Sequence, residues 1–259
     1  MLTQFAIHLI CGLSLVWCIM PRSEVTSGFF RIQMLVTLGL SVLAAMAIGP
    51  TSTATGVDPV FGGEIVRWIS VTLAVLSFLG SVMWTLERRA AGTRFAFAIA
   101  AVSTLTVILG SVPGDGFMTL KGNLTWLTEL STAAVSGITV GGMLLGHWYL
   151  TQPGLPRAPL EEQVTWLGRI WPVEVVLLLV PPGMVSALNG TIDDGYNGML
   201  GWFWVACAVT TIGLVVVTKL ALREKYYSAV MAATGLLYLA ILTAFGTDLV
   251  ARAILSLAE

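Results

Sequence analysis

Two ionisable side chains stand within long apolar stretches of this chain, where a proton-exchanging site could be built. His147 lies near the end of the apolar stretch 130–150, and Glu174 lies inside the stretch 170–188. A proline-rich connection joins the two stretches, and each residue lies about one turn from the joined end of its own stretch. We therefore expect the two side chains to meet directly or through a water. A carboxylate beside an imidazole can accept or release a proton near neutral pH. The pair could therefore pass a proton between water and a bound ligand.

Arginine residues near the same connection allow a simpler interpretation. Glu174 could be interfacial and pair with Arg169 or Arg157, while His147 could hydrogen-bond to a neighbouring helix. These four residues are the primary candidates for a proton or quinone site. The sequence identifies no catalytic residue among them.

Three further ionisable residues are secondary candidates. Asp248 and Arg252 are four residues apart, the spacing at which two side chains meet on one helix face, so we expect an ion pair. His8 lies near the outer end of the first apolar stretch. A haem b needs two imidazoles on one iron, but His8 and His147 differ in expected depth by about 18 Å at 1.5 Å per residue. A haem shared by the two histidines is therefore not expected.

The cysteine residues give no sign of a metal site. Cys11, Cys18 and Cys207 all fall within apolar stretches and show no short paired spacing. Disulfide frameworks and zinc sites both rely on such pairs. We predict no metal and no intrinsic cofactor, and a quinone is the ligand that the candidate residues would suit.

The composition places these residues in a helical membrane protein. The 259 residues are 56% hydrophobic and 10% charged, with a mean hydropathy of +0.88, whereas soluble domains carry roughly 25% charged residues. A membrane-crossing helix needs about 20 apolar residues. An all-α fold with eight transmembrane helices is therefore predicted, at residues 4–20, 31–49, 66–85, 94–112, 130–150, 170–188, 199–218 and 228–251.

Charge distribution gives an orientation. Ten of the thirteen Lys and Arg residues fall in the breaks after the first, third, fifth and seventh helices. By the positive-inside rule, a bacterial-type inner membrane would then hold both termini on the outer, periplasmic side. The sequence shows neither the alternating strands of a membrane barrel nor a basic patch for nucleic acid.

Two local patterns predict how the helices bend and pack. Pro181, Pro182 and Gly183 should interrupt the sixth helix near 180–183, because proline removes backbone donors. The fifth helix carries small residues at four-residue spacing, which allow close approach of another helix. They are Gly137, Gly141, Gly142 and Gly146.

The single transmembrane domain, 1–259, divides into possible halves of four helices each, 1–125 and 126–259. Arg31 and Ile32 open the second helix much as Arg169 and Ile170 open the sixth. An even number of helices per half would give the two halves the same orientation. Chance matches among basic loop residues remain the alternative.

This architecture resembles the membrane-anchor subunits of the polysulfide reductase and dimethyl sulfoxide reductase type. The resemblance implies quinol binding between helices and electron transfer to an outside partner; no motif aligns residue by residue, so no site residue is carried over. We therefore expect a membrane subunit of a quinone-linked electron-transfer complex, embedded in the lipid bilayer with other membrane or extracytoplasmic subunits. Whether the chain is itself an enzyme stays open.

Two alternatives of other classes stay open. A broken sixth helix with a carboxylate would also suit a small transporter or channel. A structural or assembly subunit without a site is the third interpretation. The spans look poor in buried polar residues, which favours the quinone or assembly interpretation over a water-filled transport path.

Overall fold

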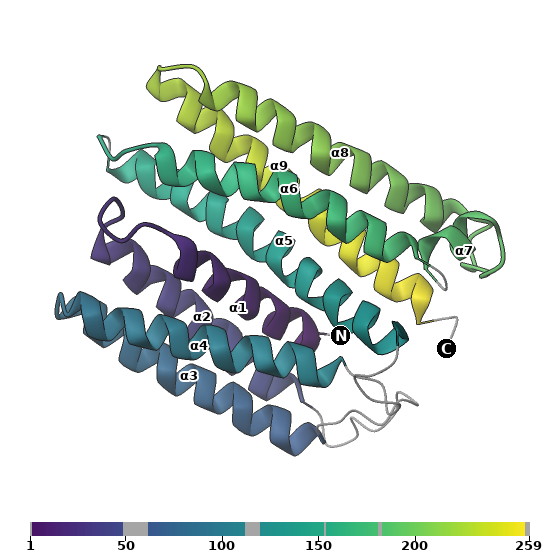
Figure 1. Cartoon of the computed structure of the whole chain (residues 1–259), viewed down its shortest axis with the longest axis horizontal. Helices are drawn as coiled ribbons and strands as arrows, with labels where there is room; N and C mark the ends of the chain where they lie inside the picture. Colours follow the sequence, from purple (N-terminus) through teal and green to yellow (C-terminus); the bar gives the residue numbers. More distant parts are fainter. Residues whose placement is uncertain (1, 49–61, 112–119, 153, 181–182, 257–259) are drawn as a thin grey trace. The chain divides into compact units, whose positions relative to one another are not determined.

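A computed structural model describes residues 2–48, 62–111, 120–152, 154–180 and 183–256, with no side chains described for 120–123. The regular structure of these residues is entirely α-helical (Figure 1). The helices are α1 Leu2–Ile19, α2 Ser27–Ala47, α3 Gly63–Thr85, α4 Arg89–Gly110, α5 Leu120–Thr151, α6 Ala158–Leu179, α7 Met184–Leu188, α8 Met199–Leu222 and α9 Tyr227–Leu255.

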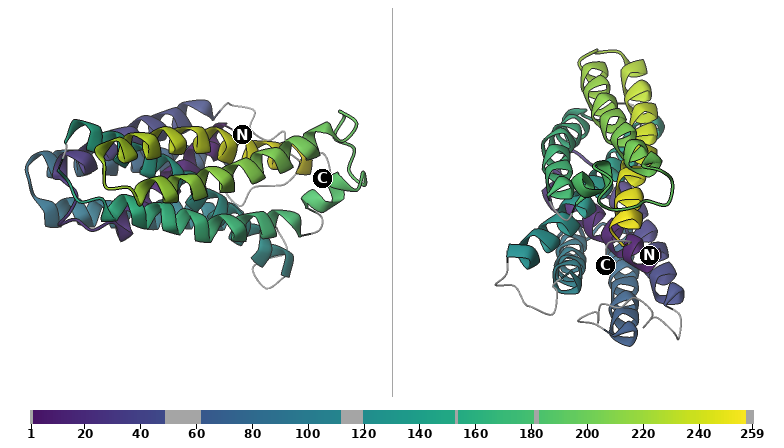
Figure 2. Two further views of the ribbon diagram at one scale, coloured as in Figure 1. Left: turned by 90° about the horizontal axis from the view of Figure 1, so that it is seen from above. Right: turned by 90° about the vertical axis from the view of Figure 1, so that its right-hand side faces the viewer.

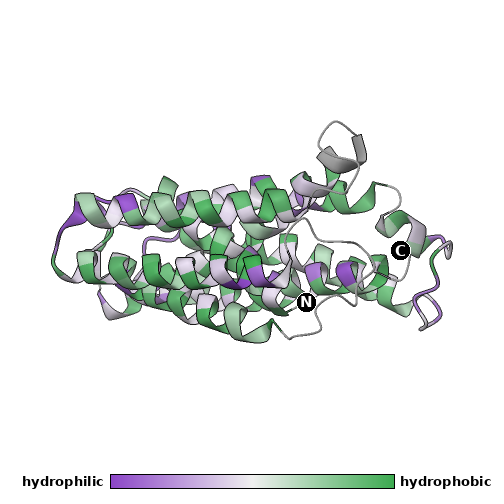
Figure 3. Ribbon diagram, turned by 90° about the horizontal axis from the view of Figure 1, so that it is seen from below, coloured by the Kyte–Doolittle hydropathy of each residue, from purple (hydrophilic) through white to green (hydrophobic). Residues whose placement is uncertain are grey.

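Seven of these helices are long and apolar enough to cross a membrane: α1 to α5, α8 and α9. This is the pattern of a multi-pass membrane protein, in agreement with the predicted class. Apolar residues follow the helices, and polar residues gather toward the connections (Figure 3). The sixth predicted span, 170–188, differs from the structure because α6 begins at Ala158 and ends at Leu179.

The first half of α6 explains this difference. It carries Glu161, Glu162 and Arg169, so its hydropathy is too low for a membrane span, yet Pro159 stands in the first turn, where proline favours helix formation. The predicted span places Arg169 at the start of the sixth helix; the structure places it well inside α6, with its guanidinium 5.3 Å from the centroid of the Trp166 ring. Helix formation therefore extends well beyond the apolar residues that a hydropathy pattern detects.

The predicted interruption of the sixth helix is confirmed. Val180 follows α6 in an extended conformation, and α7 begins only at Met184, preceded by Gly183. A Cβ on Gly183 would collide with the Leu178 and Val180 carbonyl groups, so the backbone there needs glycine. Pro181 and Pro182 lie outside the described residues.

The chain divides into two compact units, Met1–Gly137 and Ile138–Glu259, with the boundary inside α5. The first unit holds α1 to α4 and the first part of α5, and the second holds the rest of α5 with α6 to α9. The expected halves were bounded at 125 and 126, in a loop. That the halves are structural repeats stays a prediction.

In the first unit, α2 and α3 pack as an antiparallel pair. The rings of Phe30 and Trp84 stack at 4.6 Å between centroids, and Trp84 also covers Gly92 at the start of α4. The connections α1–α2 and α3–α4 meet at one end: the Ser27 hydroxyl donates to Glu87 at 3.4 Å, and Arg89 reaches the Arg22 carbonyl at 3.5 Å.

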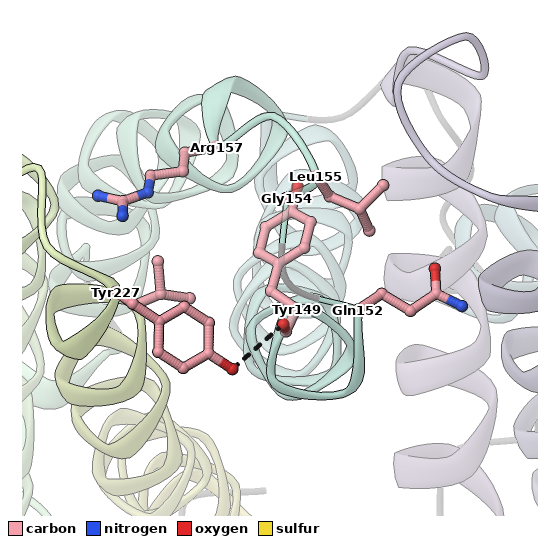
Figure 4. Close-up of a pocket in the computed structure, with 7 residues that line it drawn as sticks. Tyr149, Gln152, Gly154, Leu155, Arg157 and Tyr227 are labelled. Atoms are coloured by element: carbon pink, nitrogen blue, oxygen red, sulfur yellow. Dashed lines mark hydrogen bonds between the residues drawn. The ribbon is translucent and has the colours of Figure 1, made fainter.

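In the second unit, the connections α5–α6 and α8–α9 also share one end. Arg157 donates to the carbonyl oxygens of Glu224 and Lys225 at 2.8 and 2.9 Å. The Tyr227 hydroxyl donates to the Leu150 carbonyl at 3.1 Å, and it projects toward Tyr149 in Figure 4. Helices α8 and α9 run side by side away from this end (Figures 1 and 2).

The opposite end of the second unit is held by Asp194. Its carboxylate accepts the backbone N–H groups of Tyr196, Gly198 and Leu200 at 2.8 to 2.9 Å, just where α8 begins. These bonds, that of Gly198 above all, hold the pKa of Asp194 below its ordinary value. An anion at a helix N-terminus also meets the positive end of the helix dipole. Asp194 is therefore a cap for α8.

Polar side chains are more common in the interior than the sequence suggested. Buried hydroxyl groups occur in both units, and many donate to a carbonyl one turn earlier in their own helix, as Ser41, Ser70, Ser103 and Thr211 do. The expectation of few buried polar residues was wrong. Hydropathy undercounts them because such a hydroxyl is satisfied within its own helix.

Candidate functional site

The structure does not bring His147 and Glu174 together. Gly142 of α5 faces Gln163 of α6, so these two residues lie at a similar level along the two helix axes. From that level His147 lies five residues toward the connection, and Glu174 lies eleven residues away from it. At 1.5 Å per residue the two are about 24 Å apart along the helix axes. The expected meeting of the two residues was wrong because α6 begins at Ala158, which places Glu174 deep in the helix instead of near its start.

The environments of the two residues also differ. His147 is exposed, whereas the Glu174 side chain is only 2% exposed and belongs to the core face of α6. Arg169 is exposed and contacts Trp166, and Arg157 is engaged with backbone carbonyl groups of the α8–α9 connection. The four primary candidates thus occupy separate places in the second unit.

Asp248 and Arg252 form the expected ion pair. Arg252 Nε lies 2.6 Å from Asp248 Oδ1, and the carboxylate is buried. Ala251 and Ile254, on the same part of α9, join an apolar cluster with Trp204. The pair is therefore a buried charge contact inside one helix, close to the packing between α8 and α9.

A second carboxylate–imidazole contact lies in the first unit, between α1 and α5. His8 Nε2 is 2.7 Å from Glu129 Oε2, and both side chains are largely buried. His8 Nδ1 lies 2.6 Å from the backbone carbonyl oxygen of Gln4, one turn earlier in α1. Both ring nitrogens thus lie close to an oxygen atom. Of the candidates, His8 is the one that meets an acid from another helix.

The proton inventory of this pair follows from its contacts. The Gln4 carbonyl can only accept, so His8 Nδ1 must carry a hydrogen. One further proton belongs between Nε2 and Oε2, either on the imidazole with an ionised Glu129 or on the carboxyl with a neutral His8. The two atoms are within contact distance, but the ring does not aim Nε2 squarely at the oxygen, so they do not form an aligned hydrogen bond. The pair can hold or give up one proton.

A close crossing of α1 and α5 positions the two side chains. Gly12 lies one turn after His8, and its Cα faces the backbone of Ala133 and Gly137; a Cβ at Gly12 would fall 2.8 Å from the Gly137 Cα and would collide with the Ala133 carbonyl oxygen. Ala133 itself lies one turn after Glu129. Small residues on both helices thus bring the backbones together, and the pair occupies the next turn.

Apolar side chains surround the crossing. A buried cluster contains residues of α1, α2, α4 and α5, and Leu130 packs against it beside Glu129. Its buried members are Ala6, Ile7, Cys11, Ala44, Val107 and Ala133. Charges interact more strongly in such a low-dielectric setting than in water. The pair is therefore sensitive to anything that moves α1 against α5.

Glu129 is not among the site residues predicted from the sequence. The predicted helix of 130–150 leaves it outside, whereas α5 begins at Leu120 and includes it. A usable signal did exist: Glu129, Ala133 and Gly137 repeat every four residues on α5, as His8 and Gly12 do on α1. Matching this repeat would have placed acid and imidazole at the same level of a small-residue crossing.

No group of three or more His, Cys, Asp or Glu side chains that could hold a metal ion occurs among the residues that the structure describes. Comparisons with protein-family models, with curated proteins and with solved structures returned no match to this chain.

Proposed function

We propose that this protein is the membrane subunit of a quinone-linked electron-transfer complex, in which His8 and Glu129 exchange a proton with the bound quinone. The observation that carries the proposal is the buried 2.7 Å contact between His8 Nε2 and Glu129 Oε2. Ionisable groups inside a membrane-crossing bundle mark functional sites by default. This pair replaces His147 and Glu174 as the proton-exchanging group of the proposal.

The chemistry that the pair would perform is proton transfer. A quinol that gives two electrons to a partner subunit also gives up two protons, and each must find a base. The Glu129 carboxylate would take one proton and pass it on to water before it takes the second. His8 stabilises the ionised carboxylate when its Nε2 is protonated. Because His8 Nδ1 contacts the Gln4 carbonyl, Nε2 is the ring nitrogen left to exchange a proton with Glu129.

The test compares two variants in the assembled complex. Glu129→Gln and His8→Gln keep a hydrogen-bonding side chain of similar size but remove the exchangeable proton. We expect quinone-dependent turnover to fall by about 100-fold, the lower range of contributions from general acid–base catalysis, with the amount of complex in the membrane unchanged. Glu64→Gln, an exposed acid at the start of α3 in the same unit, is the control.

The outcomes separate the proposals. Full turnover in Glu129→Gln, with the wild-type amount of complex, would remove the pair from catalysis and favour a structural or assembly role. A mass-spectrometric inventory of the purified protein should find quinone and partner subunits. A preparation that contains neither would contradict the electron-transfer proposal itself.

A small transporter is the second candidate, because of the break between α6 and α7. Glu174 is buried one turn before Leu178, just ahead of that break. Broken helices beside a buried carboxylate are typical of transport sites, and the many buried hydroxyl groups no longer argue against one. Proton-coupled solute uptake in proteoliposomes, lost in Glu174→Gln and kept in Glu129→Gln, would favour this candidate.

A further inference from the structure

A small pocket lies between α6 and α8, at the end of the second unit where the α5–α6 and α8–α9 connections meet. Its volume is about 210 Å³. The residues that line it are Glu161, Val164, Thr165, Lys219, Leu222 and Arg223. Val164 and Leu222 are buried and form an apolar floor, while the remaining side chains are polar.

The pocket carries charges of both signs that do not neutralise each other. Lys219 and Arg223 stand one turn apart at the end of α8, and Glu161 stands in the first turn of α6. All three are exposed. Within the described part of the chain, none of the three takes part in an ion pair. The pocket can therefore offer two cations and one carboxylate to a ligand.

Its surroundings are those of a membrane interface. Trp166 follows Thr165 on α6 and carries the Arg169 guanidinium over its ring, and tryptophan is enriched where helices leave the bilayer. On α8, Val216 and Leu220 lie next to Lys219 and are about half exposed. A ligand with its polar group in the pocket would thus lay an attached hydrocarbon chain along an apolar helix surface.

We propose that this pocket binds a phospholipid with a phosphoethanolamine headgroup. The phosphate would lie between Lys219 and Arg223, which can both donate to it, with the Thr165 hydroxyl nearby. The ammonium group would lie at Glu161. Basic pockets between membrane helices bind lipid phosphates, and the acid in this one selects a headgroup that also carries a cation with N–H donors.

The three charged residues make separable predictions. Removal of the two cations weakens binding of every phospholipid, since all share the phosphate. Removal of Glu161 weakens phosphatidylethanolamine most, because phosphatidylglycerol has no ammonium group and phosphatidylcholine keeps the charge attraction but has no N–H donor. A charge-assisted hydrogen bond contributes roughly 1.5 to 3 kcal/mol, so each change should weaken binding about tenfold or more.

The experiment measures lipid retention by native mass spectrometry of the purified protein, titrated with each of the three lipids. We expect the wild type to prefer phosphatidylethanolamine by about tenfold. Glu161→Gln should lose the preference for phosphatidylethanolamine and keep its affinity for phosphatidylglycerol. The double variant Lys219→Gln, Arg223→Gln should bind both lipids more weakly. Arg88→Gln with Arg89→Gln, at the basic connection of the first unit, is the charge-matched control and should behave as the wild type.

Two results would overturn the proposal. One is equal retention of all three lipids by the wild type, which would mean that the pocket does not read the headgroup. The other is an equal loss in the control variant, which would mean that the basic charges act only through the general field of the surface. Circular dichroism of each variant checks that it is folded, because these exposed side chains should contribute little to stability.

Discussion

Replacement of Gly12 by alanine should separate α1 from α5 and thereby disturb the site that they carry. The three atoms nearest to a Cβ at this position are backbone atoms, two in the Ala133 carbonyl group and the Gly137 Cα. A flexible side chain could rotate away, but backbone cannot. The helices must therefore move apart by about 1.5 to 2 Å to restore an ordinary van der Waals distance of roughly 3.5 Å.

The expected cost combines two opposing contributions. Overpacking of a well-packed interior destabilises by about 1 to 3 kcal/mol, and a backbone collision belongs at the upper end. Alanine also gains about 1 kcal/mol over glycine in helix propensity. Gly39 of α2 has no atom within 4 Å of a built Cβ, so Gly39→Ala keeps the propensity gain without the collision. The difference between the two variants isolates the packing cost.

Thermal unfolding of the purified protein in detergent measures that difference. At roughly 2 to 4 °C per kcal/mol for a chain of this size, Gly12→Ala should unfold about 6 to 12 °C below Gly39→Ala. Because His8 lies one turn from Gly12, the same variant should also lose quinone-dependent turnover. Equal midpoints for the two variants would refute the close crossing, and with it the account of how the pair is positioned.

Three other outcomes test separate parts of the structure. Asp194→Asn should destabilise the protein at neutral pH more than Asp193→Asn, whose carboxylate accepts only a loop N–H. The pKa of Asp194 is lowered on folding, so the carboxylate contributes fully to folding stability above about pH 4. That contribution is lost as the pH falls further through the folded pKa. The urea midpoints of the wild type and Asp194→Asn should therefore converge in acid. A cysteine at Asn189 should react with an impermeant reagent in intact cells, whereas one at Glu224 should react only after permeabilisation; the reverse would invert the predicted topology. Gly146→Ala should destabilise the second unit less than Gly12→Ala does the first, since its Cβ meets the Thr234 side chain, which can rotate.

The helical membrane class could be predicted from the sequence because it depends on the most robust pattern in the chain, which is apolar length. The expected stretches 199–218 and 228–251 correspond to α8 and α9, and each helix extends a few residues beyond its stretch. The interruption after α6 could be predicted for a local reason: two prolines and a glycine in succession deny the backbone its donors and its helical conformation.

The site could not be predicted by the same means, for one physical reason. Hydropathy detects where a helix meets hydrocarbon, but the helix itself continues wherever backbone hydrogen bonds and propensity allow. Both α5 and α6 begin about ten residues before their apolar stretches. The late predicted starts placed Glu129 outside the helix and Glu174 near a helix end. Glu129, which meets His8, was therefore not predicted, and Glu174 was predicted to meet His147 instead.

The two small-residue contacts of α5 lead to different consequences. At Gly146 the neighbouring side chain is Thr234, whose hydroxyl already donates to the Val230 carbonyl one turn earlier; that contact serves packing. At Gly137 the neighbouring atoms belong to the backbone of Gly12 and Leu13 in α1. One turn before Gly12, His8 stands opposite Glu129. A 2.7 Å contact between side chains from two helices needs the helix separation fixed to a fraction of an ångström. Packing of backbone against backbone fixes it in this way, because backbone atoms have no alternative rotamers. The crossing of α1 and α5 is thus part of the proposed proton-exchanging site, and we expect substitutions there to alter turnover before they unfold the protein.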